Sequence, residues 1–285
     1  MKTSLRPLLM AALLLLGGAG TLHAQLSKIF VASSGNDAND GSRGSPKRNF
    51  QAAHDAVAAG GQIVVLDTAG YGALNITKSL AVTVPPGVNG FVTVSGDNSG
   101  ITINAGASVV VALRGLIVEG GGSDANGRGI QANSVGDLAI EECTVRSFFF
   151  GILATAMNLY VHHCTVRGCS YGLAVENGAN NVPVLAVATG CRLEQNSSDG
   201  VLALANNGSG GSVDLTLADC VSAGNDFGIE SDFPGAVVRV DNCRVTSNRR
   251  GLVAAFGGQI LSRGNNTVEH NTNADIGTIG IYSAK

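Results

Sequence analysis

Charged side chains recur at one position of a repeating phrase in the sequence. Three residues after the position where cysteine recurs, successive repeats carry Glu119, Arg146, Arg167 and Glu194. Guanidinium groups bind carboxylates through paired hydrogen bonds, so Arg146 and Arg167 are candidate binding residues for an acidic ligand. The alternative is a ladder of exposed ion pairs, Glu119 with Arg146 and Arg167 with Glu194, worth about 0.2–1 kcal/mol per pair. The balance of one acid beside each arginine favours the ladder.

A second group of polar side chains occupies the position just before the recurring cysteine. Glu142 stands there in one repeat, and His163, preceded by His162, stands there in the next. A carboxylate beside a histidine could act as an acid/base pair or a weak metal site. Two histidines and one carboxylate are also ordinary on a solvated turn, and no further ligand stands nearby. We therefore predict neither a catalytic residue nor a metal ligand, and retain Glu142 and His163 only as candidate binding residues.

Two other features could contact a ligand. The only aromatic run is Phe148 to Phe150, which could stack on flat rings but is predicted mainly to pack at an inward turn. Asp226 and Arg249 fall at equivalent points of neighbouring repeats, beside Asp199 and Arg250, and predict an ion pair; the alternative is a subsite for a saccharide. The order of residues gives no Ser-His-Asp arrangement, phosphate loop or paired-cysteine metal spacing.

The elements that position these residues follow from the repeat. Its cysteine column returns at intervals of 21 to 29 residues, and Asn266 takes the place of cysteine in the last repeat. Asparagine recurs five residues later, and a glycine then opens a second apolar segment. The members of the cysteine column are Cys143, Cys164, Cys191, Cys220 and Cys243, and those of the asparagine column are Asn196, Asn225, Asn248 and Asn271. Three short strands per repeat, each with one inward apolar column, predict a single all-β parallel β-helix.

The cysteines are predicted to be buried free thiols. Identical side chains on successive coils lie about 4.8 Å apart with parallel Cα–Cβ bonds, whereas a disulfide needs Cβ atoms about 3.8 Å apart. Free cysteine packs as a small apolar side chain.

Composition agrees with many short strands and limits the partners. The chain of 285 residues holds 40 glycines, 6 prolines and no tryptophan, and 14% of its residues are charged. Glycine supplies the turn conformations that other residues avoid. A net charge of −3 without a basic cluster gives no electrostatic basis for binding nucleic acid or an anionic membrane surface.

The N-terminal part divides into three segments. Residues 1–24 have two basic residues, an apolar run and a small-residue exit, which predict a cleaved signal peptide and an exported protein, periplasmic or secreted. Residues 25–61 hold a strand over Ile29–Ala32 and an amphipathic helix over Asn49–Ala59, ended by Gly60-Gly61, that would cap the open end of the coils. A polar loop near Asn36 faintly resembles a calcium loop, but its oxygen spacing favours simple turns.

Residues 62–285 are predicted to form the β-helix. Before the cysteine repeat, short apolar segments alternate with Gly, Asn or Pro turns and leave no room for a crossover helix. The predicted strands are Ile63–Leu66, Leu74–Ile76, Leu80–Val84, Phe91–Val94, Ile101–Ile103 and Val109–Leu113.

Several phrases resemble the right-handed parallel β-helix superfamily that includes pectate lyases, and more narrowly a group of exported bacterial β-helix proteins of unassigned function. The phrases are Gly72 to Ser79, Ile103 to Ala107, Leu113 to Leu116, Leu261 to Asn266 and Gly277 to Gly280. The resemblance implies fold and export and leaves activity open. In lyases of the superfamily, clustered acidic residues hold calcium near a basic arginine, so calcium is expected here only if the chain is lyase-like.

Three functions remain open at this point. The first is a non-catalytic protein that binds an extended polysaccharide, with an acidic one as the expected partner. The second is a polysaccharide lyase or a related carbohydrate-active enzyme, and the third is a structural or adhesive envelope protein. A lyase requires convergent carboxylates beside an arginine, whereas a binding protein requires exposed rows of aromatic or arginine side chains. A structural protein requires neither.

Overall fold

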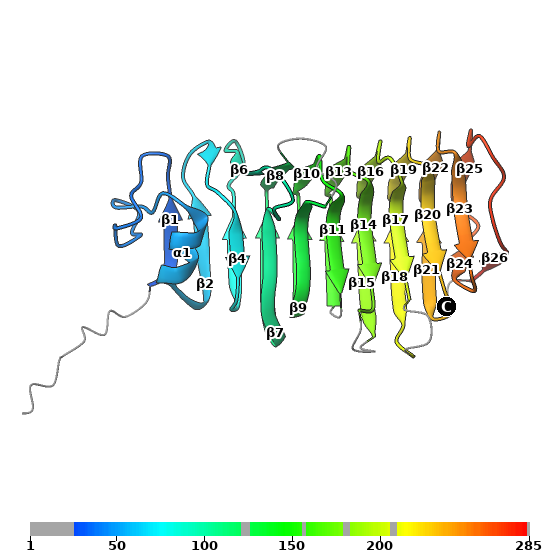
Figure 1. Ribbon diagram of the computed structural model, residues 1–285, viewed down its shortest axis with the longest axis horizontal. Coiled ribbons are helices and arrows are strands. Elements are labelled where there is room, and N and C mark those ends of the chain that lie inside the picture. Colours follow the sequence, from blue (N-terminus) through cyan, green and yellow to red (C-terminus); the bar gives the residue numbers. More distant parts are fainter. Residues whose placement is uncertain (1–25, 121–125, 156–157, 179–182, 206–209, 284–285) are drawn as a thin grey trace, which may run out of the picture.

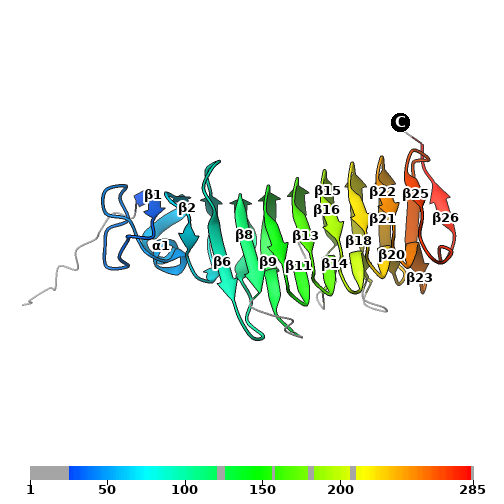
Figure 2. The same ribbon diagram turned by 90° about the horizontal axis from the view of Figure 1, so that it is seen from above.

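The chain coils into a parallel β-helix, as the repeat predicted. A computed structural model describes residues 26–120, 126–155, 158–178, 183–205 and 210–283; the predicted signal peptide lies outside these ranges. Figure 1 shows the coils side by side along one axis, and in the view from above (Figure 2) helix α1 and strand β26 lie at opposite ends of the stack. All the strand ladders among the described residues are parallel. No described helix has the length and apolar character needed to span a membrane.

Each coil contributes strands to three walls. The first wall is a nine-stranded sheet of short strands within the described ranges. Its members are β3 (Ala69–Gly70), β6 (Gly90–Val94), β8 (Leu116–Gly120), β10 (Thr144–Arg146), β13 (Thr165–Arg167), β16 (Arg192–Glu194), β19 (Val221–Ala223), β22 (Arg244–Thr246) and β25 (Thr267–Glu269).

The second wall is the longer surface that follows each asparagine turn. It contains β4 (Leu74–Ile76), β11 (Phe150–Thr155), β14 (Tyr171–Glu176), β17 (Asp199–Leu204), β20 (Phe227–Asp232) and β23 (Arg250–Ala255). The third wall closes the coil with β1 (Leu26–Val31), β2 (Val57–Val65), β5 (Leu80–Thr83), β12 (Asn158–His162), β15 (Val184–Thr189), β18 (Val213–Ala218), β21 (Ala236–Asp241), β24 (Gln259–Ser262) and β26 (Ile279–Ile281).

Two long strands join the second and third walls, which corrects one prediction. The segments Ile101–Ile103 and Val109–Leu113, predicted as separate strands, are the two ends of β7 (Ile101–Arg114), and β9 (Arg128–Glu141) is equally continuous. Register shifts between Ile103 and Val110 take up the bend, and Gly106 adopts a left-handed φ of 95° there. The glycine bends the strand without ending it.

The inner surfaces of the three walls form one apolar core. Ile152, Leu173 and Val201 on the second wall pack toward Val145 and Val166 on the first. All five cysteines of the column are buried free thiols, as predicted, and so is Cys169 at the turn. Each column thiol donates to the carbonyl oxygen two residues before it, with Sγ to O distances of 3.2–3.5 Å.

The predicted asparagine column is a hydrogen-bonded ladder at the turn between the first and second walls. The backbone N–H of Asn196 donates to Asn225 Oδ1 at 2.9 Å, and that of Asn225 donates to Asn248 Oδ1 at 2.9 Å. Asn225 Nδ2 also donates to the Leu193 carbonyl at 2.9 Å. Buried turn groups are thereby satisfied by side-chain amides. Cys169 ends the ladder by donating its N–H to Asn196.

A glycine after the ladder turns the chain into the second wall. A Cβ at Gly200 would lie 2.3 Å from Ser222 Oγ and 2.7 Å from Asn225 Nδ2, both on the inner side. Gly151, Gly172 and Gly228 are confined in the same way. Since each of these glycines faces inward, the residue directly before it faces outward.

The N-terminal cap differs in detail from the prediction. Helix α1 spans Phe50–Ala56 and ends at Val57, so Gly60-Gly61 lies within β2. Asn49 makes no side-chain capping bond, because its amide donates to Asp37 Oδ2 at 2.6 Å. Asp37 also accepts the N–H groups of Arg48 and Asn49, so this loop is held by turn hydrogen bonds, as expected of the simpler interpretation. Hydrogen bonds from Asn49 and Arg48 outweigh burial and lower the pKa of Asp37.

Candidate functional site

The predicted charged column lies on the outer face of the first wall, but only half of its ladder forms. Arg146 Nη2 lies 2.8 Å from Glu119 Oε1 across neighbouring strands β10 and β8, as predicted. Arg167 and Glu194 are in register on β13 and β16, yet Glu194 pairs with Arg192 on its own strand at 2.5 Å. The predicted pair of Arg167 with Glu194 is therefore wrong, because a nearer arginine on the same side of β16 takes the carboxylate.

The second predicted group does not form an acid/base pair. Glu142 accepts from Arg114 Nη2 at 2.8 Å, and His163 stacks on His162 with ring centroids 3.8 Å apart. Glu142 and His163 both have left-handed φ angles, 53° and 50°. Their recurrence before the cysteine marks a turn, so the solvated-turn interpretation holds and the acid/base hypothesis does not.

A different set of side chains forms a row on the outer face of the second wall, which we call the axial row. The row consists of Arg128, Phe150, Tyr171, Asp199, Phe227 and Arg250. Register pairs Phe150 with Arg128 and with Tyr171, and Phe227 with Asp199 and with Arg250. Each of these residues is the first of its strand, and Figure 1 shows the six strands side by side.

Aromatic side chains fill the first half of this face. Phe150 and Tyr171 are stacked with centroids 4.9 Å apart, and Phe149 meets Tyr171 edge-on at 5.4 Å. Beside them Leu153 and Leu202 are each 7% exposed although they lie on the outer side of the sheet. Phe148 packs inward as predicted, whereas Phe149 and Phe150 belong to this outer cluster. The prediction of inward packing was wrong for these two because the chain reverses its facing at Gly151.

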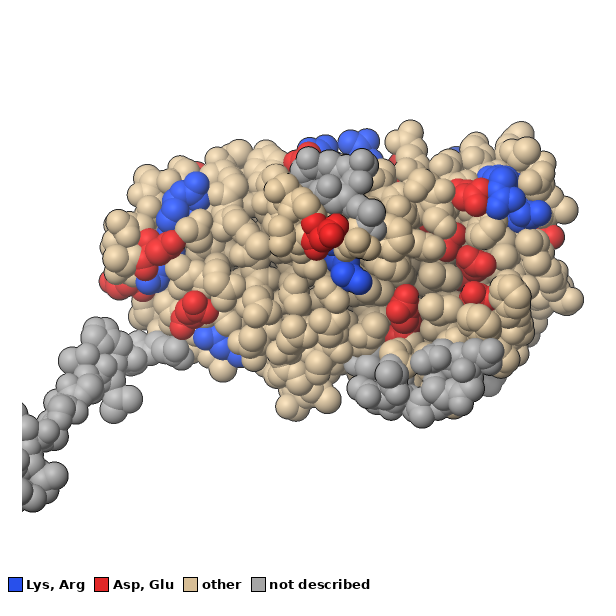
Figure 3. All heavy atoms as spheres, viewed as in Figure 1, with Lys and Arg blue, Asp and Glu red and all other residues tan. Residues whose placement is uncertain are grey.

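Acidic side chains gather over the other half. Figure 3 shows them over the part of the molecule where β17 and β20 lie. Asp199 opens β17 and is only 1% exposed, while Glu230 and Asp232 lie on β20. We call these three residues the carboxyl cluster. Burial, with repulsion from Asp226 and Asp232, raises the pKa of Asp199 to about 6. Burial and the nearby Asp199 carboxyl raise the pKa of Glu230 to about 8.

Asp199 and Glu230 affect each other's ionisation, because their negative charges would repel across neighbouring strands. The pKa of Glu230 is the higher of the two, so Glu230 is the carboxyl that keeps its proton at neutral pH. Burial also raises the pKa of Asp232.

The carboxyl cluster lacks a compensating cation. No lysine or arginine within the described ranges forms an ion pair with Asp199, Glu230 or Asp232; the nearby Arg249 pairs with Asp226, Nη2 to Oδ2 at 2.8 Å, as predicted. Asp232 Oδ1 and Asp199 Oδ2 are buried and accept no hydrogen bond, while Asp199 Oδ1 accepts one from the Ser198 hydroxyl at 3.3 Å. The described residues contain no group of three acidic, histidine or cysteine side chains arranged to hold a metal ion.

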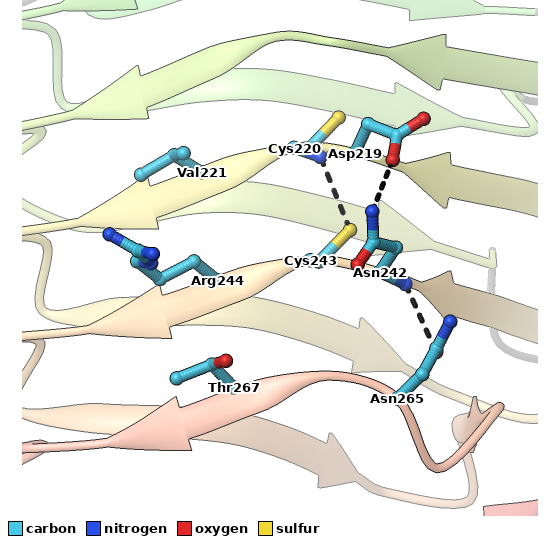
Figure 4. Close-up of a pocket in the computed structure, with 8 residues that line it drawn as sticks. All are labelled: Asp219, Cys220, Val221, Asn242, Cys243, Arg244, Asn265 and Thr267. Atoms are coloured by element: carbon cyan, nitrogen blue, oxygen red, sulfur yellow. Dashed lines mark hydrogen bonds between the residues drawn. The ribbon is translucent and has the colours of Figure 1, made fainter.

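Two other hollows are less suited to bind a ligand. The hollow in Figure 4, of about 390 Å³, lies at the turns before β19, β22 and β25. Its polar groups bind one another: Asn242 Nδ2 donates to Asp219 Oδ1 at 2.6 Å, and the Asn242 N–H donates to Asn265. A hollow of about 400 Å³ on the third wall is lined by Tyr160, which is 50% exposed, and Leu185.

Sequence reasoning placed Asp199 and Arg250 beside the predicted Asp226–Arg249 pair but did not identify the axial row or the carboxyl cluster. The sequence did contain one indication of the row. In each coil, the residue directly before the strand-opening glycine belongs to the same outward-facing column. The glycine lies three residues after the asparagine position in the other coils but four after Asn196, so the outward column is out of step with the cysteine column there. Asp199 and Glu230 lie in different outward columns and meet only diagonally across neighbouring coils, which no periodicity in the sequence marks.

Comparison with known proteins places the fold. A family model described as "Right handed beta helix region" matches residues 99–273. A pectate lyase, Pel9A, has a similar structure with a TM-score of 0.57 and 14% identity, over 90% of this chain and 77% of that one. A rhamnogalacturonan lyase matches with a TM-score of 0.43 and 12% identity, over 82% and 72%. No curated protein sequence matches the chain. The chain belongs to the right-handed β-helix family.

Proposed function

We propose that the protein is exported and binds an extended polysaccharide along the axial row of the second wall. The observation that carries this proposal is the row itself, in which arginine and aromatic side chains occur at one position of successive coils. Coils repeat about every 4.8 Å, so six positions extend about 24 Å along the axis. A rigid row of this length suits a stiff polymer better than a compact ligand. The export signal expected in residues 1–24 and the known ligands of similar folds are consistent with it, the latter by analogy only.

The chemistry of the row supports contact with sugars. Aromatic rings offer flat apolar surface to the C–H faces of sugar rings, and arginine donates several hydrogen bonds to hydroxyl groups. Phe150 and Tyr171 are partly exposed and are held by packing on Leu153 and each other. Arg128 lies 5.9 Å from the Phe150 ring, so its guanidinium is preoriented at the edge of the aromatic cluster. Little side-chain freedom would be lost on binding.

Affinity electrophoresis through gels that contain dissolved polysaccharides tests the proposal. The panel contains neutral, uronic acid and amino sugar polymers. Retardation by at least one polymer is expected, relative to migration in an empty gel. Unaltered migration in every gel would refute the proposal and favour a structural or adhesive role.

A second candidate function is a carbohydrate-active enzyme, and the carboxyl cluster favours it. A carboxyl group that keeps its proton near neutral pH can act as a general acid. Glu230 is partly exposed and could deliver a proton, while the buried Asp199 would position it. Glycosidases use two carboxyls that both reach the scissile bond, whereas Asp199 is only 1% exposed and cannot reach a bound sugar. We therefore rank it second. Release of reducing ends or of unsaturated product from any polymer of the panel, lost in Glu230→Gln, would reverse this order.

A further inference from the structure

We infer that two stacked phenylalanines, Phe233 and Phe256, form a second sugar-binding site at the corner between the second and third walls. Its ligand class is a neutral polysaccharide whose pyranose rings have a flat face lined by C–H groups. The inference rests on the proposed function, because it assigns a further contact for a polysaccharide outside the axial row. Phe233 and Phe256 directly follow β20 and β23, which Figure 1 shows side by side toward the C-terminal end of the stack.

The backbone at both positions is unusual for phenylalanine. Phe233 has a φ of 68° and Phe256 a φ of 46°, in the left-handed region that bulky side chains disfavour. Within the described ranges, every other non-glycine residue with a left-handed φ is polar, and none of them is buried. These residues are Glu142, Ser147, His163, Gln195, Asp219, Asn242, Ser247 and His270. Only at this corner do phenylalanines replace polar residues, and they do so on two successive coils.

The two rings contribute little to the folded core. Phe256 is 76% exposed and Phe233 is half-buried, and neither belongs to the buried apolar clusters of the described chain. They stack on each other with ring centroids 5.4 Å apart and an angle of 24° between the ring planes. Exposed rings on a disfavoured backbone are better explained by a contact with another molecule than by folding.

The two turns hold the rings in place. The Phe233 N–H donates to the Ala255 carbonyl at 3.3 Å, and the Gly258 N–H donates to the same carbonyl at 2.8 Å. A Cβ at Gly258 would lie 2.2 Å from the Ser231 carbonyl oxygen, so the neighbouring turns are in close contact. The rings are thereby preorganised and would lose little freedom when a ligand binds.

The size and charge of the pair fit a neutral sugar. An aromatic side chain buries about 150–250 Å², whereas a stable protein interface needs about 800 Å² from each partner, so two rings are too small a surface for a second protein. Pyranose rings with equatorial hydroxyl groups present C–H faces of matching size, which pack on aromatic rings. The rings carry no charge and the acidic Asp232 directly precedes Phe233, which disfavours a uronic acid.

This site is separate from the axial row. Phe227 of the row opens β20, and Phe233 follows the last residue of that strand, which is 6 residues long. At about 3.3 Å per residue, the two positions are about 20 Å apart across the second wall. A short oligosaccharide would reach one of the two sites, whereas a polymer can occupy both and gain avidity.

Affinity electrophoresis through hydroxyethyl cellulose, a soluble neutral glucan, tests the inference. Phe256→Asn removes the ring and introduces a side chain that tolerates a left-handed φ. We expect its apparent dissociation constant to rise about two- to tenfold. Its melting temperature should stay close to that of the wild type, because relief of backbone strain offsets the lost stacking. Phe256→Tyr keeps the ring, and His270→Asn replaces an exposed ring at the left-handed turn after β25; both should be retained as the wild type is.

Four results would overturn the inference. Unchanged retention of Phe256→Asn in a gel that retards the wild type would leave only the axial row, with the proposed function intact. Retardation of the wild type by uronic acid or amino sugar polymers alone would exclude a neutral ligand. A lower melting temperature without loss of retention would limit the rings to packing on each other. A wild-type dimer that Phe256→Asn dissociates in sedimentation would identify a contact with a second copy. If no polymer of any class retarded the wild type, the proposed function itself would fail.

Discussion

The outer faces of the first and second walls carry similar charged residues in different arrangements. On the first wall acids and bases are neighbours, as in the 2.8 Å pair of Glu119 with Arg146. On the second wall Asp199 has another acid, Glu230, as its neighbour, and the row continues into aromatic rings. A balanced ladder needs no ligand to be stable. An unbalanced and partly buried cluster is better explained by an interaction partner, so perturbed carboxyls indicate function where paired ones indicate structure.

The largest expected effect is a loss of stability when the glycine at the turn into the second wall is replaced. Gly200→Ala places a Cβ 2.3 Å from Ser222 Oγ and 2.7 Å from Asn225 Nδ2, within a buried hydrogen-bonded turn. We expect a loss of about 1–3 kcal/mol in the free energy of unfolding, measured by urea denaturation. Gly44→Ala is the control, because a Cβ there would have no atom within 4 Å and the backbone is outside the left-handed region. Equal stability of Gly200→Ala and wild type would contradict the confined turn.

The next effect concerns the pH dependence of stability. The pKa of Glu230 is raised from 4.5 to about 8 in the folded protein, so the folded state binds more protons than the unfolded chain in this range. Its contribution to stability is present below about pH 4.5 and is lost as the pH rises toward 8. Glu230→Gln should therefore be more stable relative to wild type near pH 9 than near pH 5, by a few degrees in melting temperature.

Glu119→Gln is the matched control on the first wall, because its carboxylate is paired with Arg146 and has no acidic neighbour on the adjoining strand. Its difference from wild type should not increase toward high pH. A pH dependence that is the same for Glu119→Gln and Glu230→Gln would remove the distinction between the two walls.

The smallest effect is expected for the first-wall arginines. Arg146→Ala should lower the free energy of unfolding by less than about 1 kcal/mol, because exposed ion pairs contribute little. Arg167→Ala, whose side chain has no ion-pair partner among the described residues, should change it less. Neither variant should change polysaccharide retention, which electrophoresis would measure. Loss of retention in Arg146→Ala would indicate that the ligand binds the first wall, where the candidate binding residues were predicted from the sequence.

The sequence predicted the coil and missed the site for one physical reason. Core columns such as Cys143 and Cys164 must repeat on every coil, because each coil buries its side chains against the next. Periodicity therefore revealed the core, the asparagine ladder at Asn225 and the parallel β-helix. Outer residues are free of that constraint, so Asp199 and Glu230 follow no period.

An ion pair was predicted correctly where the residue directly opposite on the neighbouring strand was also the nearest residue of opposite charge. Glu119 and Arg146 are direct cross-strand neighbours, and their pair formed as predicted. Arg192 lies two residues from Glu194 on the same strand and took that carboxylate from Arg167. Helix α1 ended earlier than Gly60 because Val57 already extends into a ladder with Leu26. Competition from a residue outside the column, whether on the same strand or on another ladder, cannot be seen in a single column.

The central claim is that the ligand lies on the second wall, and a matched pair of tyrosine variants tests it most directly. Tyr171 belongs to the axial row, and Tyr160 is 50% exposed on the third wall. In affinity electrophoresis with a polymer that retards the wild type, Tyr171→Ala should weaken retention about tenfold or more, as expected for an aromatic contact at the centre of an interface. Tyr160→Ala should behave as wild type. Full retention of Tyr171→Ala together with loss in Tyr160→Ala would contradict the account.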